Sequence, residues 1–200
     1  MTAGELSTVV YLHGFNSAPQ SVKGQLLARA AASLPSAPRF HLPHLPPRPM
    51  VAMAMVTAWV EANVAAGEGV SFVGSSLGGF YATWLAERFG ARAVAINPAI
   101  RPQASLESFL GPQRNLYTGE TYMLTHDDLA AMEALRVERI TRPERYLLLV
   151  RSGDELLDWR SAVRYYAGAW QYVGGGGDHG WTDFAPMVPT VLQFATPFRG

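Results

Sequence analysis

Gly74-Ser75-Ser76-Leu77-Gly78 is the stretch that decides the fold, because it lies between an apolar strand pattern at 70–73 and a helical pattern at 78–89. In a Gly-x-Ser-x-Gly elbow the serine occupies a strained turn between strand and helix, and the small residues let neighbouring backbone approach closely. Ser76 is therefore the candidate nucleophile. Ser75 lacks a glycine two residues before it and does not fit the spacing.

A serine nucleophile requires a histidine base and a carboxylate that orients the base, here in the chain order serine, acid, histidine. Asp154 follows a predicted buried strand at 146–150 and is the favoured acid, with Asp158 as the competing carboxylate. His179 follows a predicted short strand at 171–173 and a run of four glycines, and it is the favoured base. Asp178 precedes the histidine and is expected to cap a turn.

An oxyanion hole is the third requirement, and it takes one amide after the nucleophile and one from the loop after an early strand. A strand is predicted at 8–12, directly before His13 and Gly14. We therefore expect the amides of Phe15 and Leu77 to form the oxyanion hole, with Gly14 allowing the loop to approach the elbow. For His13 two roles remain open: organising this loop by hydrogen bonding, or being a buried imidazole with satisfied partners.

Length and composition favour one soluble domain over residues 1–200. The chain is 48% hydrophobic, so it can form a substantial core, and its 16 basic residues balance 16 acidic ones. That balance gives no field that would attract nucleic acid. Cysteine is absent, which excludes disulfides and thiolate chemistry, and no apolar stretch reaches the roughly 18 residues of a membrane span. We expect a cytoplasmic protein with no membrane insertion.

Apolar strands alternate with amphipathic helices, which predicts an α/β fold with a mostly parallel sheet of about six or seven strands and helices on both faces. The region 101–142 fits this alternation least well and is expected to be either a cap or lid over the pocket or an ordinary surface excursion. The predicted strands are 8–12, 39–42, 70–73, 92–96, 146–150 and 171–173, and the predicted helices are 21–33, 50–66, 78–89, 127–136, 159–169 and 184–195.

The remaining histidines do not indicate a metal site. His41 and His44 are three residues apart, but the prolines around them prevent a helix that would place both on one face. His126 is expected at a helix start, with Thr125 or Asp127 as the cap. No metal and no organic cofactor is expected.

Several longer motifs extend beyond the elbow, and together they resemble the YqiA-like bacterial esterases of the α/β-hydrolase superfamily. These motifs cover nearly the whole chain and occupy residues 11–17, 74–84, 97–102, 117–120, 153–158 and 177–179. The resemblance implies a small hydrolase of carboxylic esters, with acyl thioesters as a further class, and it matches Ser76, Asp154 and His179 to the triad. The chain departs from the pattern in having four glycines before the histidine loop where about two are expected.

The sequence thus predicts a serine esterase that acts on short- to medium-chain acyl esters through an acyl-enzyme, with a small-molecule ester or thioester as its partner. An acyl-CoA thioesterase with the same triad, a C–C hydrolase, a peptidase and a non-catalytic ligand-binding protein on this fold remain as alternatives. Arg101 is considered for an anionic group of an acyl donor, although a surface ion pair is its commoner role. The expected substrate-binding residues are His13, Gly14, Asn16, Arg101 and Tyr117.

Overall fold

A six-stranded parallel sheet forms the centre of the computed structural model, which describes residues 7–35 and 37–196. The two ends of the expected 1–200 domain, residues 1–6 and 197–200, lie outside the described residues. Every pairing in this sheet is parallel, in the order β2-β1-β3-β4-β7-β8. The predicted α/β fold is therefore confirmed. The strands are β1 (Ser7–Leu12), β2 (Arg39–His41), β3 (Gly69–Ser75), β4 (Arg92–Ile96), β7 (Tyr146–Arg151) and β8 (Trp170–Gly174).

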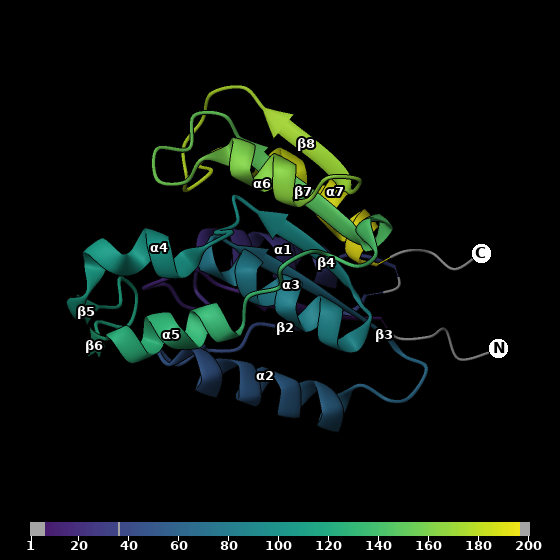
Figure 1. The fold of residues 1–200 in the computed structure, drawn as a ribbon. Coiled ribbons are helices and arrows are strands. Elements are labelled where there is room, and N and C mark those ends of the chain that lie inside the picture. Colours follow the sequence, from purple (N-terminus) through teal and green to yellow (C-terminus); the bar gives the residue numbers. More distant parts are fainter. Residues whose placement is uncertain (1–6, 36, 197–200) are drawn as a thin grey trace.

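Helices cover both faces of the sheet (Figure 1). Alternating side chains of β1 feed two separate cores: Val9 and Tyr11 pack with the helices of one face, and Val10 and Leu12 with those of the other. Both faces of the central strands are thus buried, which is why they are continuously apolar. The first face carries α1 (Val22–Ala32) and α7 (Val188–Ala195); the second carries α2 (Pro49–Asn63), α3 (Leu77–Phe89) and α6 (Trp159–Tyr165).

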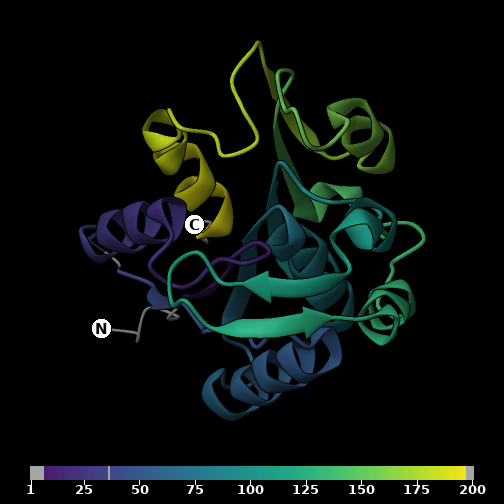
Figure 2. The same ribbon diagram turned by 90° about the vertical axis from the view of Figure 1, so that its left-hand side faces the viewer.

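The chain between β4 and β7 forms an insertion at the carboxyl ends of the strands, on the side away from the two termini (Figure 1). Its two short strands pair antiparallel as a separate hairpin, which lies in front in Figure 2. The sequence predicted only the last helix of this region. The insertion contains α4 (Pro102–Leu106), a 3-10 turn at Glu107–Phe109, β5 (Gly111–Arg114), β6 (Thr121–Leu124) and α5 (His126–Ala134).

Three predicted helices begin or end at least three residues inside their predicted bounds. The helix expected at 184–195 begins as a 3-10 turn at Ala185–Met187 and becomes α-helical only from Val188. Pro189 has no amide that could donate to the carbonyl of Ala185, so an α-helix that starts earlier would lose this bond. The helix expected at 159–169 ends at Tyr165, before a turn in which Gly168 has a φ of 88°. The helix expected at 50–66 ends at Asn63.

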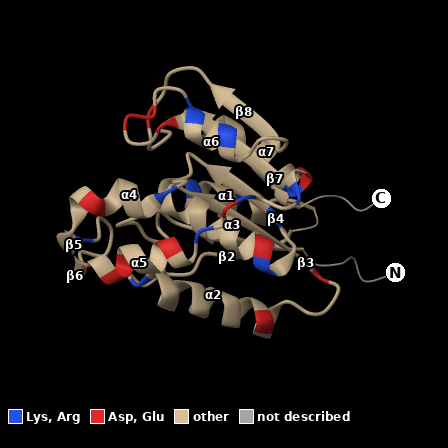
Figure 3. Cartoon of the chain, in the orientation of Figure 1, with Lys and Arg blue, Asp and Glu red and all other residues tan. Residues whose placement is uncertain are grey.

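Charged residues of both signs are distributed over the elements without separating by sign (Figure 3). Within residues 7–35 and 37–196, no helix combines the length and the apolar character that crossing a bilayer requires.

Candidate active site

The turn between β3 and α3 places Ser76 at the carboxyl end of the sheet with φ 57° and ψ −122°, a backbone conformation that L residues rarely adopt. Hydrogen bonds from both sides hold this turn. The amide of Ser76 donates to the carbonyl of Ile96 at 2.9 Å, and its own carbonyl accepts from the amides of Gly79 and Ala99 at 2.9 and 3.1 Å. The strained serine is therefore fixed against β4 and α3.

Glycines at the elbow are required by contacts of backbone with backbone. A Cβ added to Gly78 would lie 2.0 Å from the carbonyl oxygen of Leu12, and one added to Gly74 would lie 2.0 Å from the carbonyl oxygen of Gly78. A Cβ on Gly14 would lie 3.3 Å from the Cβ of Ser76. The absence of these side chains brings the loop after β1 against the nucleophile turn.

The structure brings Ser76, His179 and Asp154 together in one line of hydrogen bonds. The Nε2 atom of His179 lies 3.0 Å from the Oγ of Ser76, and its Nδ1 atom lies 2.8 Å from the Oδ2 of Asp154. The side chain of Asp154 is 2% exposed and that of His179 is 16% exposed. This geometry allows a base to take the serine proton while the carboxylate orients the base.

Asp154 is held as a carboxylate. Burial raises its pKa, but the hydrogen bond from His179 and the amides of Leu157 and Leu156 lower it, so that the net pKa lies below the ordinary value. Its Oδ1 accepts from these two amides at 2.8 and 2.9 Å, while Oδ2 faces the histidine. An ionised Asp154 requires the proton of His179 on Nδ1, which leaves Nε2 as the acceptor for the serine hydroxyl.

The competing acid, Asp158, has a different role. Its side chain accepts a hydrogen bond from the amide of Arg160 at 3.1 Å and caps the start of α6. Asp178, expected to cap a turn, bonds to Trp181 through its backbone carbonyl, which accepts from the Trp181 amide at 3.1 Å.

The loop after β1 is organised around the buried ring of His13. Its Nε2 atom accepts from the amide of Leu45 at 3.1 Å, so Nδ1 carries the proton and donates to the carbonyl of Gly14, also at 3.1 Å. Burial lowers the pKa of His13 to about 4, and the ring is neutral at neutral pH. The two roles that the sequence left open for His13 are therefore both fulfilled: the ring is buried with satisfied partners, and it holds the loop.

The candidate oxyanion donors, Phe15 and Leu77, border one pocket. Within residues 7–35 and 37–196, neither of their amides donates a hydrogen bond to another group of the chain. Both amides are thus available to an oxygen atom bound beside Ser76.

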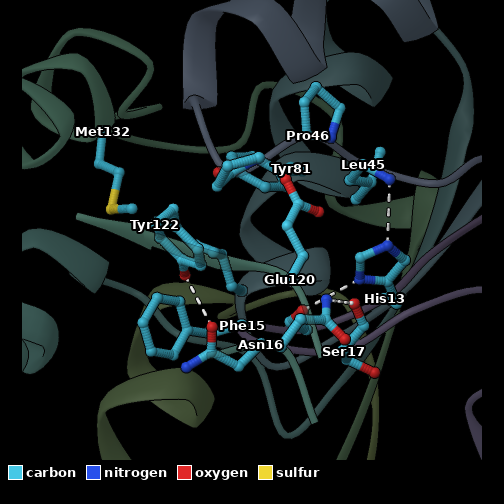
Figure 4. A pocket seen from close by; sticks show the side chains of 14 residues that line it. His13, Phe15, Asn16, Ser17, Leu45, Pro46, Tyr81, Glu120, Tyr122 and Met132 are labelled. Atoms are coloured by element: carbon cyan, nitrogen blue, oxygen red, sulfur yellow. Dashed lines mark hydrogen bonds between the residues drawn. The ribbon is translucent and has the colours of Figure 1, made fainter. Parts of the chain in front are cut away.

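The pocket beside the elbow combines apolar and polar walls (Figure 4). The loop after β1, the proline-rich segment 43–48 before α2, the hairpin and α5 each contribute to it. Of the expected substrate-binding residues, His13, Gly14 and Asn16 line this pocket. The other lining residues are Phe15, Ser17, Leu45, Pro46, Pro47, Leu77, Tyr81, Asn115, Glu120, Tyr122 and Met132.

The other two expected substrate-binding residues lie outside the pocket lining. Arg101 is exposed and precedes α4, where its backbone carbonyl accepts hydrogen bonds from Ala104 and Ser105. Tyr117 is 48% exposed in the turn of the hairpin. Both residues belong to the insertion, and their exposure together with their absence from the pocket lining does not support the predicted contact with substrate.

Comparison with known families supplies the identity of the chain. Residues 8–196 match the model of the family described as Uncharacterised protein family (UPF0227). The chain belongs to this family. The match confirms the resemblance to the YqiA-like members of the α/β-hydrolase superfamily.

Solved structures show the α/β-hydrolase fold for this UPF0227 chain. A protein from Agrobacterium vitis S4 superimposes with a TM-score of 0.75 at 20% identity, covering 96% of this chain and 88% of that one. Est1E from Butyrivibrio proteoclasticus gives 0.71 at 15% identity, with the same two coverages of 96% and 88%. Alpha/beta hydrolase domain-containing protein 10 from mouse gives 0.70 at 17% identity, covering 92% and 87%.

The hairpin of the UPF0227 chain is attached to the candidate oxyanion loop, which the sequence did not predict. Asn16, with a φ of 53°, donates from Nδ2 to the Oε1 of Gln113 at 3.0 Å and accepts at Oδ1 from the hydroxyl of Tyr122 at 2.8 Å. Asn115 donates from Nδ2 to the carbonyl of Ser17 at 2.7 Å. The insertion therefore forms a wall of the pocket and restrains the loop that carries Phe15.

Within the described part of the chain, no group of three or more His, Cys, Asp or Glu residues is arranged to hold a metal ion. His41 ends β2 and stacks on Trp59 with the ring centroids 3.7 Å apart. The Nε2 atom of His44 lies 3.7 Å from a carboxylate oxygen of Glu120. His126 is the first residue of α5, where Thr125 is the cap, as one of the two predicted alternatives has it.

Proposed function

We propose that this chain is a serine esterase that hydrolyses carboxylic esters. The observation that carries the proposal is the continuous hydrogen-bonded line from Asp154 through His179 to Ser76, at a strained turn beside two available amides. Membership in the family and the likeness to a solved structure described as the esterase domain of a Rhodothermus marinus protein support a hydrolase of this class.

In the proposed reaction, the Oγ of Ser76 attacks the ester carbonyl carbon while Nε2 of His179 accepts the hydroxyl proton. Asp154 stabilises the imidazolium that forms and keeps Nδ1 protonated. The carbonyl oxygen becomes an oxyanion and accepts from the amides of Phe15 and Leu77. Loss of one such donor costs about 2.7 to 4 kcal/mol of transition-state stabilisation in a comparable site.

Collapse of the tetrahedral intermediate releases the alcohol, which takes its proton from Nε2 of His179 and leaves an acyl group on Ser76. Water then attacks the acyl carbon while His179 accepts a proton from it, and the carboxylic acid departs. The proposed steps use only groups of this chain, the ester and water.

Short- to medium-chain acyl groups suit the pocket best. Tyr81, Tyr122 and Met132 contribute apolar surface to it, and the hairpin and α5 form part of its walls. An acyl-CoA thioesterase is the weaker alternative, because the described lining residues include no Lys or Arg, and Glu120 places a carboxylate there. Negative charge at the pocket disfavours a phosphate-bearing leaving group.

The test of this proposal compares wild type with Ser76→Ala on p-nitrophenyl acetate, butyrate and octanoate, and on acetyl-CoA and butyryl-CoA. Ser76→Ala is expected to lower kcat by at least about 10³-fold with an unchanged urea unfolding midpoint. Ser105→Ala, on an exposed position of α4, is the matched control and is expected to retain full turnover. Equal turnover in wild type and Ser76→Ala would overturn the proposal.

A further inference from the structure

The segment that carries His179 follows four glycines, residues 174–177, which have no side chains that could pack against their surroundings. Gly176 and Gly177 have φ angles of 62° and 76°. A Cβ added to Gly175 or Gly176 would have no atom within 4 Å. The run is held at Gly174 and Gly176, whose carbonyls accept from the amides of Ser152 and Gly153 at 2.8 and 2.9 Å. Because glycine backbone is permissive, contacts made after the run also contribute to fixing the position of the histidine.

Side chains from three other elements bind the backbone of residues 178–180. Asn97 donates from Nδ2 to the carbonyl of His179 at 2.9 Å and to the carbonyl of Asp178 at 3.3 Å. The Oε2 atom of Glu155 accepts the amide of His179 at 2.9 Å. The ammonium group of Lys23, the single lysine of the chain, donates to the carbonyl of Gly180.

Asn97 connects this segment with two strands. Its side chain is buried, and its Oδ1 accepts from the backbone amide of Arg151 at 2.9 Å. Its backbone amide donates to the carbonyl of Leu149 at 2.8 Å. Its φ of 39° is one that asparagine tolerates better than most residues. One amide side chain thus joins β4, β7 with the Asp154 loop, and the segment of His179.

Glu155 is the neighbour of the candidate acid and lies on an exposed loop rich in carboxylates, seen as the acidic turn before α6 in Figure 3. Two hydrogen bonds thus join the loop of Asp154 to His179: the Glu155 side chain binds the backbone amide of His179, and the Asp154 side chain binds its ring. A contact of an exposed glutamate contributes little to the free energy of unfolding. The main effect of this contact is therefore to fix the local position of the His179 backbone.

We propose that Asn97 and Glu155 are positioning residues that hold the backbone of His179 so that Nε2 faces the Oγ of Ser76. The inference rests on the proposed function, in which His179 is the base. Neither residue touches the reacting atoms, and both act through the histidine. A displacement of about 1 Å at a catalytic group can lower the rate 100-fold. The loss of one of these hydrogen bonds is therefore expected to lower kcat and to leave KM unchanged.

Glu155→Ala and Glu155→Gln test the proposal, because glutamine retains an oxygen that can accept the His179 amide. We expect Glu155→Ala to lower kcat per active site about 10-fold, with KM within about twofold and the same urea midpoint as wild type. Glu155→Gln is expected to restore kcat to within about twofold of wild type. Glu61→Ala, a surface glutamate paired with Arg88 at 3.6 Å, is the matched control.

Asn97→Asp is the second variant, and it keeps the shape of the side chain and the oxygen that accepts from Arg151. It replaces the amide donor by a carboxylate oxygen facing two carbonyls, and kcat is expected to fall about 100-fold. A fluorophosphonate labelling rate measured on each variant should follow kcat, because labelling also needs a positioned base.

The outcomes separate this inference from the proposed function. Wild type that labels at Ser76, together with Glu155→Ala that labels and turns over at the wild-type rate, overturns the positioning role while leaving the esterase proposal intact. A Glu155→Gln protein as slow as Glu155→Ala also overturns it, because the accepted hydrogen bond would then not be the cause. Wild type that does not react at Ser76 overturns both.

Discussion

Acidification is expected to destabilise the protein through His13. The ring must be neutral in the folded chain, because Nε2 accepts the amide of Leu45 and protonation would turn two donors toward each other. Burial lowers the pKa of His13 from 6.5 to about 4. Between these two pKa values the unfolded chain binds a proton that the folded chain does not. The contribution of His13 to the free energy of unfolding is therefore complete above about pH 6.5 and decreases as the pH falls toward 4.

The magnitude follows from the two pKa values. Relative to pH 7.5, the free energy of unfolding is expected to fall by about 2 kcal/mol at pH 5 and by about 3 kcal/mol at pH 4 on account of this one ring. Asp154 acts in the same direction only below its unfolded pKa, because its folded pKa lies beneath the ordinary carboxyl value. The window from pH 7.5 to 5 therefore excludes Asp154, but burial also lowers the pKa of His41, which adds a loss in the same direction. Comparison with a variant at position 13 isolates the share of His13.

Urea unfolding at pH 7.5, 6 and 5 measures the effect in wild type, His13→Gln and His126→Gln. Glutamine at 13 offers a donor and an acceptor but does not titrate, so the pH-dependent loss should shrink by about 2 kcal/mol in that variant. His126 is exposed at the start of α5, and His126→Gln should follow wild type. Identical pH dependence in wild type and His13→Gln would refute the assignment of a neutral buried His13.

Three further substitutions test the elbow, the insertion and the acid. Gly78→Ala places a Cβ 2.0 Å from the Leu12 carbonyl and should lower the free energy of unfolding by at least about 2 kcal/mol. Gly69→Ala, where the added Cβ would have no atom within 4 Å, should change it little. Equal effects of the two variants in urea titrations would contradict the close backbone contact at Gly78. Thr125→Ala removes the capping box of α5 and should cost about 1 kcal/mol, and an unchanged urea midpoint would argue against the cap. Asp154→Asn should lower kcat on p-nitrophenyl butyrate by about 10⁴-fold with KM nearly unchanged, and a loss under tenfold would reassign the acid.

The central sheet and the elbow were predictable from sequence because their determinants are local. Continuous apolar strands and the glycines around Ser76 specify a buried parallel strand that turns sharply into a helix. Chain order then points to Asp154 and His179, which the structure brings within hydrogen-bonding distance of one another. The role of Asp158 could be assigned only from the structure, since a carboxylate that caps a helix and one that orients a base look alike in sequence.

The hairpin was not predictable because its first strand, Gly-Pro-Gln-Arg at 111–114, carries no alternating apolar pattern. It is held instead by polar contacts with distant residues: Asn16 donates to Gln113 and accepts from the hydroxyl of Tyr122. The exposure of Arg101 and Tyr117 depends on this same tertiary arrangement, and no local signal specifies it.

The contacts of Asn97 and Glu155 with the backbone of His179 were also not predictable from sequence. Asn97 precedes a proline, and its local sequence indicates only a turn at a strand end. Its partners, the carbonyls of residues 178 and 179, are more than 80 residues away in the chain. Glu155 resembles any exposed loop glutamate until the fold places the histidine amide against it.

The most direct test of the account is intact-mass spectrometry after exposure to a fluorophosphonate, with the modified peptide mapped in wild type and in Ser76→Ala. A single adduct on Ser76 that is absent from the mutant is expected, because only a serine with a positioned base reacts readily. A folded wild-type protein that gains no adduct, or gains one on another residue, would contradict the assignment of Ser76 as an activated nucleophile.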